Sequence, residues 1–202
     1  MQRIKKLHDD LYVIDDILED RDFFNVLVEF RPAFNNWVFN KRDDIPSMMG
    51  GVQDLEPKPK FGNLNKHTYA GLGDNLVLIK YAEVVKYTAM KLLKKKLHLE
   101  RLNTNIQFAN QHSSVHTDGA SNQWTICLFV SYTWNEEWGG PFHIFIDDEE
   151  YMVGFKPCRA VLFRADHGHK GFAPSSMCPD PRFSVAFTYT EDHAMIDRKV
   201  NV

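Results

Sequence analysis

The hydrophobic period of this sequence changes near residue 100, and this change constrains the fold more than any other feature. Before that point, two segments repeat apolar residues at α-helical spacing. After it, apolar and polar residues alternate in short runs that end at Gly, Pro, Asn or Asp. Many short strands after a helical segment are typical of an antiparallel sandwich or barrel. The sequence therefore predicts a mainly β fold with N-terminal α-helices packed on one face.

The first hundred residues are expected to provide the helical support of this fold. A short strand over Leu11–Leu18 precedes a first helix, which Asp20 or Asp22 can cap. A second helix follows the cap Gly73-Asp74-Asn75. Its predicted buried face consists of Val77, Tyr81, Val84, Val85, Thr88 and Leu92. Between the helices, the Pro- and Gly-rich segment Asp43–Asn65 predicts a long loop, and such loops often serve as lids or binding loops.

The strands of the second part are predicted from their period of two and from the turn residues between them. They are expected at residues 102–108, 123–131, 142–146, 151–155, 159–164 and 182–190. A chain of 202 residues is long enough for one sizeable core. We therefore expect a single domain over residues 1–202, with helical support over about 1–100 and a β core over about 101–192.

Composition excludes several classes of protein. The formal net charge of −3 argues against nucleic acid or an anionic membrane as a partner held mainly by charge. No run approaches the roughly 18 apolar residues of a membrane-spanning helix. The first residues carry charges where a secretory segment would be apolar, and three cysteines are too few for a disulfide framework. A cytoplasmic location is expected.

A histidine and a carboxylate lie two residues apart in the segment HTDG. On an extended backbone, His116 and Asp118 point the same way, and His169 follows the predicted strand 159–164. Two histidines and one carboxylate are the ligand set of non-haem Fe(II) oxygenases, and three protein ligands leave coordination positions open. These residues are therefore the candidate metal ligands. In a sequence with nine histidines, however, an isolated pair of this kind also arises by chance.

The last predicted strand, RFSVAFTYT, opens with an arginine and alternates strictly. One face is apolar, and the other carries Arg182 and Ser184 among small residues. An arginine directed into a sandwich needs an anion because an unpaired buried charge is costly, and this strand offers no acid on that face. A ligand carboxylate bound by Arg182 and the Ser184 hydroxyl would supply that charge. The alternative is an arginine at the solvent end of the strand, paired with a surface acid.

Together, H-x-D at 116–118, the histidine at 169 and R-x-S at 182–184 resemble the motif of the Fe(II)/2-oxoglutarate-dependent dioxygenases, above all that of their prolyl-hydroxylase-like branch. The surroundings agree: VHTDG precedes WTICLFVS, a turn with two Trp residues ends in Gly-Gly (TWNEEWGGPFHIF), and RAVLFRADHGH precedes RFSVAFTY. The resemblance spans about residues 103–190. VIDDIL near the start also resembles the strand that leads into these domains.

The resemblance implies a double-stranded β-helix, which is a jelly-roll of the cupin-like kind. It implies Fe(II) bound by His116, Asp118 and His169, which Mn, Co, Ni or Zn can replace during purification. 2-Oxoglutarate would be the cosubstrate, with its distal carboxylate on Arg182 and Ser184. O₂ would be the oxidant and ascorbate a candidate reductant.

Two assignments within this resemblance stay open. His167 is the alternative second histidine, although Gly171 and Pro174 follow His169 at the distances that the family prefers. Many prolyl hydroxylases also use a strand Tyr as a second partner of the 2-oxoglutarate carboxylate. The comparable strands of this sequence offer Phe129, Leu128, Asn105 or Gln107 instead.

The implied reaction is hydroxylation of an unactivated C–H bond, with 2-oxoglutarate converted to succinate and CO₂. The expected substrate is a peptidyl residue such as proline, in a groove formed by the Trp134–Trp138 turn and the loop 43–65. A free amino acid or another small molecule is the alternative. A nucleic-acid demethylase usually carries a second Arg on the last strand, which RFSVAFTYT lacks. The complete triad argues against a non-catalytic cupin-like binding module.

Overall fold

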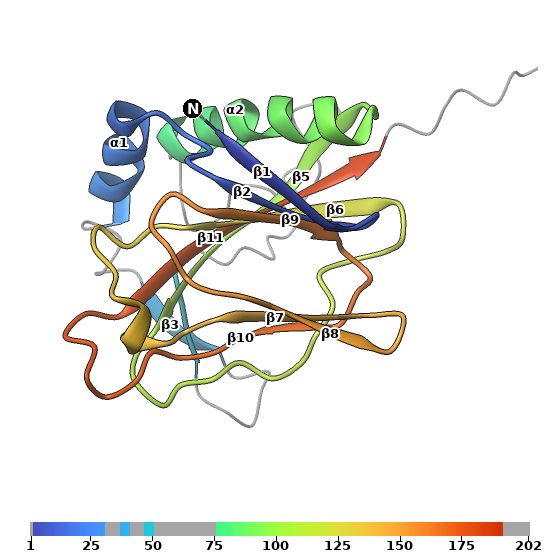
Figure 1. Cartoon of the computed structure of the whole chain (residues 1–202). Coiled ribbons are helices and arrows are strands. Elements are labelled where there is room, and N and C mark those ends of the chain that lie inside the picture. The colour runs from blue at the N-terminus through green and yellow to red at the C-terminus, as the bar shows by residue number, and fades with distance from the viewer. Residues whose placement is uncertain (1, 31–36, 41–46, 51–75, 192–202) are drawn as a thin grey trace, which may run out of the picture.

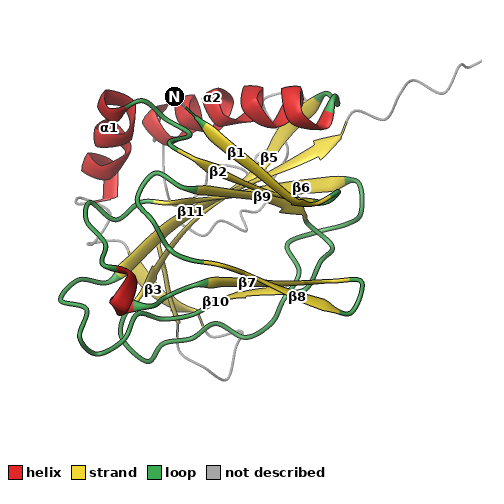
Figure 2. Cartoon of the chain, viewed as in Figure 1, coloured by secondary structure: helices red, strands yellow, loops and turns green. Residues whose placement is uncertain are grey.

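A computed structural model describes residues 2–30, 37–40, 47–50 and 76–191 of the chain. These residues form three layers (Figure 1): two helices, a large sheet beneath them, and a small sheet on the other side of the large one. Figure 2 shows that long connections join the two sheets at both ends. In the part of the chain described, no helix has the length and apolar character needed to cross a membrane.

Strands make up most of the described regular structure. They are β1 (Arg3–His8), β2 (Leu11–Asp15), β3 (Trp37–Asn40), β4 (Ser47–Gly50), β5 (Leu97–Gln107), β6 (Gln123–Phe129), β7 (Phe142–Ile146), β8 (Glu149–Val153), β9 (Ala160–Arg164), β10 (His169–Gly171) and β11 (Arg182–Glu191). The helices are α1 (Asp20–Phe30), α2 (Leu76–Leu93) and the short 3-10 helix Glu136–Trp138.

Both sheets are antiparallel. The large sheet has eight strands in the order β1-β2-β9-β6-β11-β5-β4-β3, and the small sheet has the order β10-β7-β8. The mainly β, antiparallel class predicted from the sequence is therefore confirmed. All six strands predicted beyond residue 100 are present, although the first begins earlier, at Leu97, and the fourth lies at 149–153 rather than 151–155.

The first hundred residues differ from the prediction because they contribute four strands to the large sheet as well as the helices. β1 was missed because it is an edge strand of sequence RIKKLH, mostly exposed and without apolar alternation. The predicted loop 43–65 is wrong at residues 47–50, which form β4. Its other residues, and the predicted cap at 73–75, lie outside the described residues.

One of the two hydrophobic cores lies between the helices and the large sheet. The buried residues of α2 in this core are Leu78, Tyr81, Ala82, Val85 and Ala89. They meet the apolar face of β11, where Val185 and Phe187 are fully buried. The Tyr189 hydroxyl also donates to the Ala82 carbonyl (2.7 Å). The predicted face of α2 was partly wrong, since Val84 is 41% exposed and the buried stripe includes Leu78 instead.

The second core lies between the two sheets. Apolar side chains of β2, β6, β9, β7 and β8 form it, with Phe129, Phe142 and Phe163 among the largest. Beside it, β11 and β5 pair in register with Arg182 opposite Gln107 and Ser184 opposite Asn105. The fold thus leaves a polar strip on the inner face beside an apolar core.

Candidate active site

Backbone pairing brings the three predicted metal ligands together. His116 forms an isolated bridge with His169 of β10, with N–H to carbonyl distances of 3.0 and 2.8 Å. Two residues further on, the Asp118 amide donates to the Ala165 carbonyl at the end of β9 (2.9 Å). The segment 116–118 is therefore tied both to the small sheet and to the large one.

The ligand atoms of His116, Asp118 and His169 all lie within 4.8 Å of one another. Asp118 Oδ2 is 3.5 Å from His169 Nε2, and Asp118 Oδ1 is 4.0 Å from His116 Nε2. The Asp118 and His169 side chains are 9% and 6% exposed, whereas His116 is 46% exposed. The triad therefore has a buried side toward the sheets and an open side at His116.

Hydrogen bonds fix the orientation of both imidazoles. His116 Nδ1 donates to the Ser114 carbonyl (2.9 Å), and His169 Nδ1 donates to the His167 carbonyl (3.0 Å). A carbonyl can only accept, so each ring carries its proton on Nδ1. Each Nε2 is then left with a free lone pair, which is the arrangement of a metal-binding histidine.

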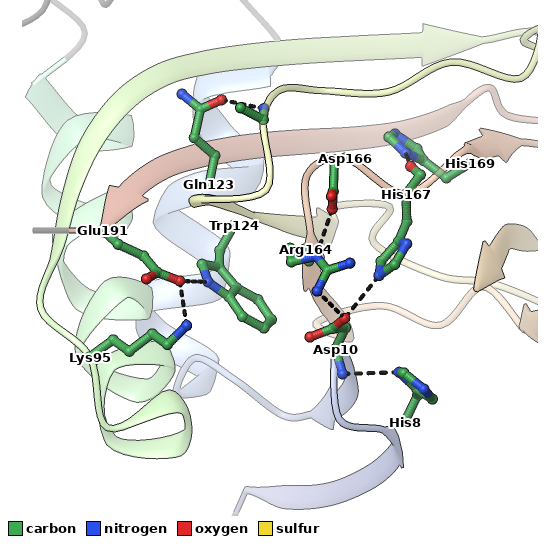
Figure 3. Close-up of polar contacts among 11 residues, drawn as sticks. His8, Asp10, Lys95, Gln123, Trp124, Arg164, Asp166, His167, His169 and Glu191 are labelled. Carbon is green, nitrogen blue, oxygen red and sulfur yellow. Dashed lines mark hydrogen bonds and ion pairs between the residues drawn. The ribbon is translucent and has the colours of Figure 1, made fainter. Parts of the chain in front are cut away.

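His167, the alternative second histidine, points away from the triad. Its Nε2 lies 3.0 Å from Asp10 Oδ2, and Arg164 Nη1 donates to the same carboxylate oxygen (2.7 Å). Figure 3 shows the His167 ring turned toward Asp10 and the His169 ring turned elsewhere. The structure therefore groups His169, and not His167, with His116 and Asp118.

The charges at the triad suit a divalent cation. Burial disfavours the charged form of Asp118, but the neighbouring His169 and Arg101 outweigh burial and hold the pKa of its carboxyl below the usual value. Burial lowers the pKa of His169 below its usual value. An ionised carboxylate and neutral imidazoles are the forms that bind metal.

Arg182 lies on the inner face of β11 and is 3% exposed. Its Nε donates to the Gly140 carbonyl (3.0 Å) and its Nη1 to Gln107 Oε1 (2.6 Å), and both acceptors are neutral. Its guanidinium also lies over the rings of Phe129 and Phe155. No ion pair joins it to an acid among the residues that the structure describes.

Burial without an acidic partner lowers the pKa of Arg182 to about 10. Two glycines let the side chain lie close to the backbone. A Cβ at Gly140 would meet Arg182 Cδ at 3.2 Å, and a Cβ at Gly171 would meet Arg182 Nη1 at 3.1 Å. The solvent-end alternative for Arg182 is therefore wrong: the charge is buried and has no acidic partner among the described residues.

Two neighbours of these groups come from β5: Gln107, one of the four residues that the sequence offered as a second partner of the carboxylate, and Arg101, which sequence reasoning missed. Gln107 binds the Arg182 guanidinium, and Arg101 donates to both the backbone carbonyl and the carboxylate of Asp118. Ser184 is 2% exposed on the same face of β11 as Arg182. Only the register of β5 with β11 reveals these contacts, since no spacing within β5 marks them.

The structure supports the predicted substrate groove only in part. Trp134 packs on Phe155 (ring centroids 4.2 Å apart) and edge-on against Trp138 (5.6 Å), so much of its ring joins the core between the sheets. The other expected wall, loop 43–65, is described only at residues 47–50.

No protein-family model matches the chain, and a search of curated proteins gave no match. Solved structures do share its fold. An oxidoreductase of the 2OG-Fe(II) oxygenase family from Burkholderia pseudomallei gives a TM-score of 0.71 at 8% identity, over 90% of this chain and 85% of that one. The α-ketoglutarate-dependent epimerase SnoN of nogalamycin biosynthesis gives 0.66 at 15% identity, over 90% and 78%.

A prolyl hydroxylase from Trichoplax adhaerens, in complex with a peptide fragment of a hypoxia inducible factor, gives a TM-score of 0.61 at 11% identity, over 91% of this chain and 84% of that one. At such identities the likeness establishes the fold alone. The chain has the fold of the 2OG-Fe(II) oxygenases, prolyl hydroxylases included, and the resemblance seen in its motifs is confirmed at that level.

Proposed function

We propose that this protein is an Fe(II)- and 2-oxoglutarate-dependent dioxygenase that hydroxylates an unactivated C–H bond of a peptidyl residue such as proline. One observation carries the proposal. Within the fold of this enzyme class, the ligand atoms of His116, Asp118 and His169 converge within 4.8 Å, and a buried Arg182 without an acidic partner among the described residues lies on the same inner face. We further propose that residues 1–202 act as one catalytic domain built on a double-stranded β-helix, of which the two facing sheets would be the core.

The residues present fit the metal. Two imidazoles whose Nδ1 atoms bond to backbone carbonyls, and one carboxylate, suit Fe(II), as well as Mn, Co, Ni or Zn in its place. The three donors leave coordination positions open, which a cosubstrate and O₂ require. The exposed edge of His116 supports entry of the substrate from that side.

The residues around Arg182 fit a carboxylate. The guanidinium has donors left over after its bonds to two neutral acceptors, and glycines at 140 and 171 let the side chain lie close to the backbone there. A planar fork of donors matches a carboxylate in two-point contact. Arg182, with the Ser184 hydroxyl, would bind the distal carboxylate of 2-oxoglutarate and so orient its other end toward the triad.

When bound, iron and 2-oxoglutarate would supply the oxidising chemistry, in which O₂ is consumed, 2-oxoglutarate becomes succinate and CO₂, and one oxygen atom enters the substrate. Ascorbate would keep the iron reduced. The protein itself would contribute by orienting the metal ligands and the cosubstrate. The backbone carbonyls at 114 and 167 hold the two imidazoles, Arg182 fixes the cosubstrate, and the apolar core between the sheets excludes water from the buried side.

The peptidyl substrate is supported by the open side of the triad and by the likeness to a prolyl hydroxylase that holds a peptide. A small-molecule substrate is the second candidate. The epimerase SnoN of nogalamycin biosynthesis matches with a higher TM-score than this prolyl hydroxylase, and that favours a small-molecule substrate. The two differ in what must reach His116: an extended chain, or a compact molecule that a pocket encloses.

The test is turnover of 2-oxoglutarate, followed as succinate, across peptides, free amino acids and methylated oligonucleotides. We expect succinate to rise with a peptide. His116→Ala and Asp118→Ala should abolish turnover and keep the fold, whereas His98→Ala, at an exposed histidine of β5, should behave as wild type. Wild-type turnover in either triad variant would contradict the ligand assignment. Stimulation by free amino acids alone would favour the second candidate.

A further inference from the structure

Asp118 has a close neighbour that the proposed reaction does not yet use. Arg101 Nη2 donates to the Asp118 backbone carbonyl (2.8 Å) and to its carboxylate oxygen Oδ1 (3.3 Å). The other carboxylate oxygen, Oδ2, faces His169 Nε2 at 3.5 Å. The two oxygens of this carboxylate therefore have different surroundings.

The position of Arg101 follows from strand register. Arg101 of β5 pairs with Thr188 of β11, and Thr188 pairs with Thr125 of β6, so these three side chains form one row across the sheet. Within this row, the Thr125 and Thr188 hydroxyls lie 3.4 Å apart, and Arg101 bonds to the Asp118 carboxylate. Asp118 thus lies over a row of polar side chains held by three neighbouring strands.

Arg101 is more buried than a typical surface arginine. Its side chain is 26% exposed and that of Asp118 is 9% exposed. Arg101 Nε is buried and has no hydrogen-bond partner among the described residues. The two groups therefore meet where solvent screens their interaction only in part.

We infer that Arg101 is a positioning residue for the metal ligand Asp118: it holds the backbone carbonyl and Oδ1, and so leaves Oδ2 directed at His169 Nε2. The inference rests on the proposed function and assigns a role to a residue outside the triad. Arg101 does not touch the metal, the cosubstrate or the substrate in this account. It acts through Asp118 alone.

The direction in which replacing Arg101 changes metal affinity distinguishes a positioning role from a purely electrostatic one. A guanidinium beside a divalent cation repels it, so removing the charge alone would tighten metal binding. Loss of a residue that orients a metal ligand weakens binding, commonly by about 10- to 100-fold. A weaker affinity in a neutral variant is therefore evidence of positioning.

The experiment compares wild type with Arg101→Gln and Arg101→Lys, using Co(II) as the probe in the absence of 2-oxoglutarate. Both replacement side chains are shorter than arginine and cannot place a donor where Arg101 Nη2 lies. Both variants should therefore bind Co(II) about 10- to 100-fold more weakly and change the visible absorption spectrum of bound Co(II). Arg159→Gln is the matched control. Arg159 is also a partly buried arginine, paired with Asp15 at the far end of β9, and its loss should leave the affinity and the spectrum unchanged.

Unchanged or tighter Co(II) binding with an unchanged spectrum in Arg101→Gln would overturn the inference. An equal loss of affinity in Arg101→Gln and Arg159→Gln would also overturn the inference, because Arg101 would then act only on general stability. Thermal melts of the metal-free proteins measure that stability. If Arg101→Gln does not fold, Arg101→Lys decides by the same two readouts. Failure of wild type to bind Co(II) would instead refute the proposed function, which keeps the two failures distinct.

Discussion

Replacing Arg182 should separate the stability of the protein from its affinity for the cosubstrate. The residue is 3% exposed and its hydrogen bonds go to neutral acceptors. Burial lowers its pKa from the usual 12.5 to about 10. At 1.36 kcal/mol for each factor of ten, the charged form is disfavoured there by about 3 kcal/mol. The ligand-free protein therefore carries a destabilising group at this position.

Arg182→Met keeps most of the side-chain volume and removes the charge. We expect the free energy of unfolding of the ligand-free variant to stay equal or to rise, because replacing buried charge by a well-packed apolar group is often neutral or stabilising. Cosubstrate binding should fall instead. Truncating one partner of a buried charged pair costs about 2–5 kcal/mol, which is roughly 30-fold to several thousand-fold in affinity.

The assay is titration of the anaerobic Fe(II) protein with N-oxalylglycine, an unreactive stand-in for 2-oxoglutarate, together with thermal melts. At about 100 times its Kd, the ligand should stabilise wild type by about 2.7 kcal/mol, or roughly 5–10 °C in a domain of this size. The variant should show no such shift. Arg182→Lys should fall between the two, because it keeps the charge and loses the fork. Equal affinity of wild type and Arg182→Met would refute the reasoning, as would a large loss of stability in the ligand-free variant.

Three further outcomes follow from the packing. Gly171→Ala would place a Cβ 3.1 Å from Arg182 Nη1, so titration should show weaker N-oxalylglycine binding and unchanged Co(II) affinity. Tyr189→Phe removes a buried hydrogen bond to a carbonyl of α2, and denaturant unfolding should show a loss of about 1 kcal/mol. The hydrogen bond and charge of Arg159 lower the pKa of Asp15 below 3.8, so Asp15→Asn should be less stable than wild type at neutral pH. That difference should vanish in melts as the pH falls below 3.8 and through the lowered pKa of Asp15, because protonated Asp15 no longer gains from the arginine.

The triad could be predicted from the sequence because its spacing depends on local geometry. His116 and Asp118 share a face of an extended segment, and His169 follows a strand whose apolar run is plain in the sequence. His167 follows the same strand, but Gly171 and Pro174 already favoured His169 in the sequence. The contact of His167 with Asp10 agrees with that choice.

The contacts around the site could not be predicted, because they depend on the pairing of strands far apart in the sequence; Gln107 was one of four candidates, and Arg101 was not a candidate. Gln107 meets Arg182 only because β5 pairs with β11 in one register, and the same register brings Arg101 to the row beneath Asp118. A shift by one residue would turn both side chains to the opposite face. The strands β1 and β10 were missed for a different reason: one is a charged edge strand, and the other has only three residues.

The central claim is that one inner face binds a metal through His116, Asp118 and His169 and a dicarboxylate through Arg182. The most direct test is calorimetric titration of the wild-type protein with 2-oxoglutarate without O₂, once with Fe(II) bound and once after its removal by a chelator. The account predicts one 2-oxoglutarate per Fe(II)-loaded chain and much weaker binding to the metal-free chain. Equal binding with and without the metal, or no binding in either state, would contradict it.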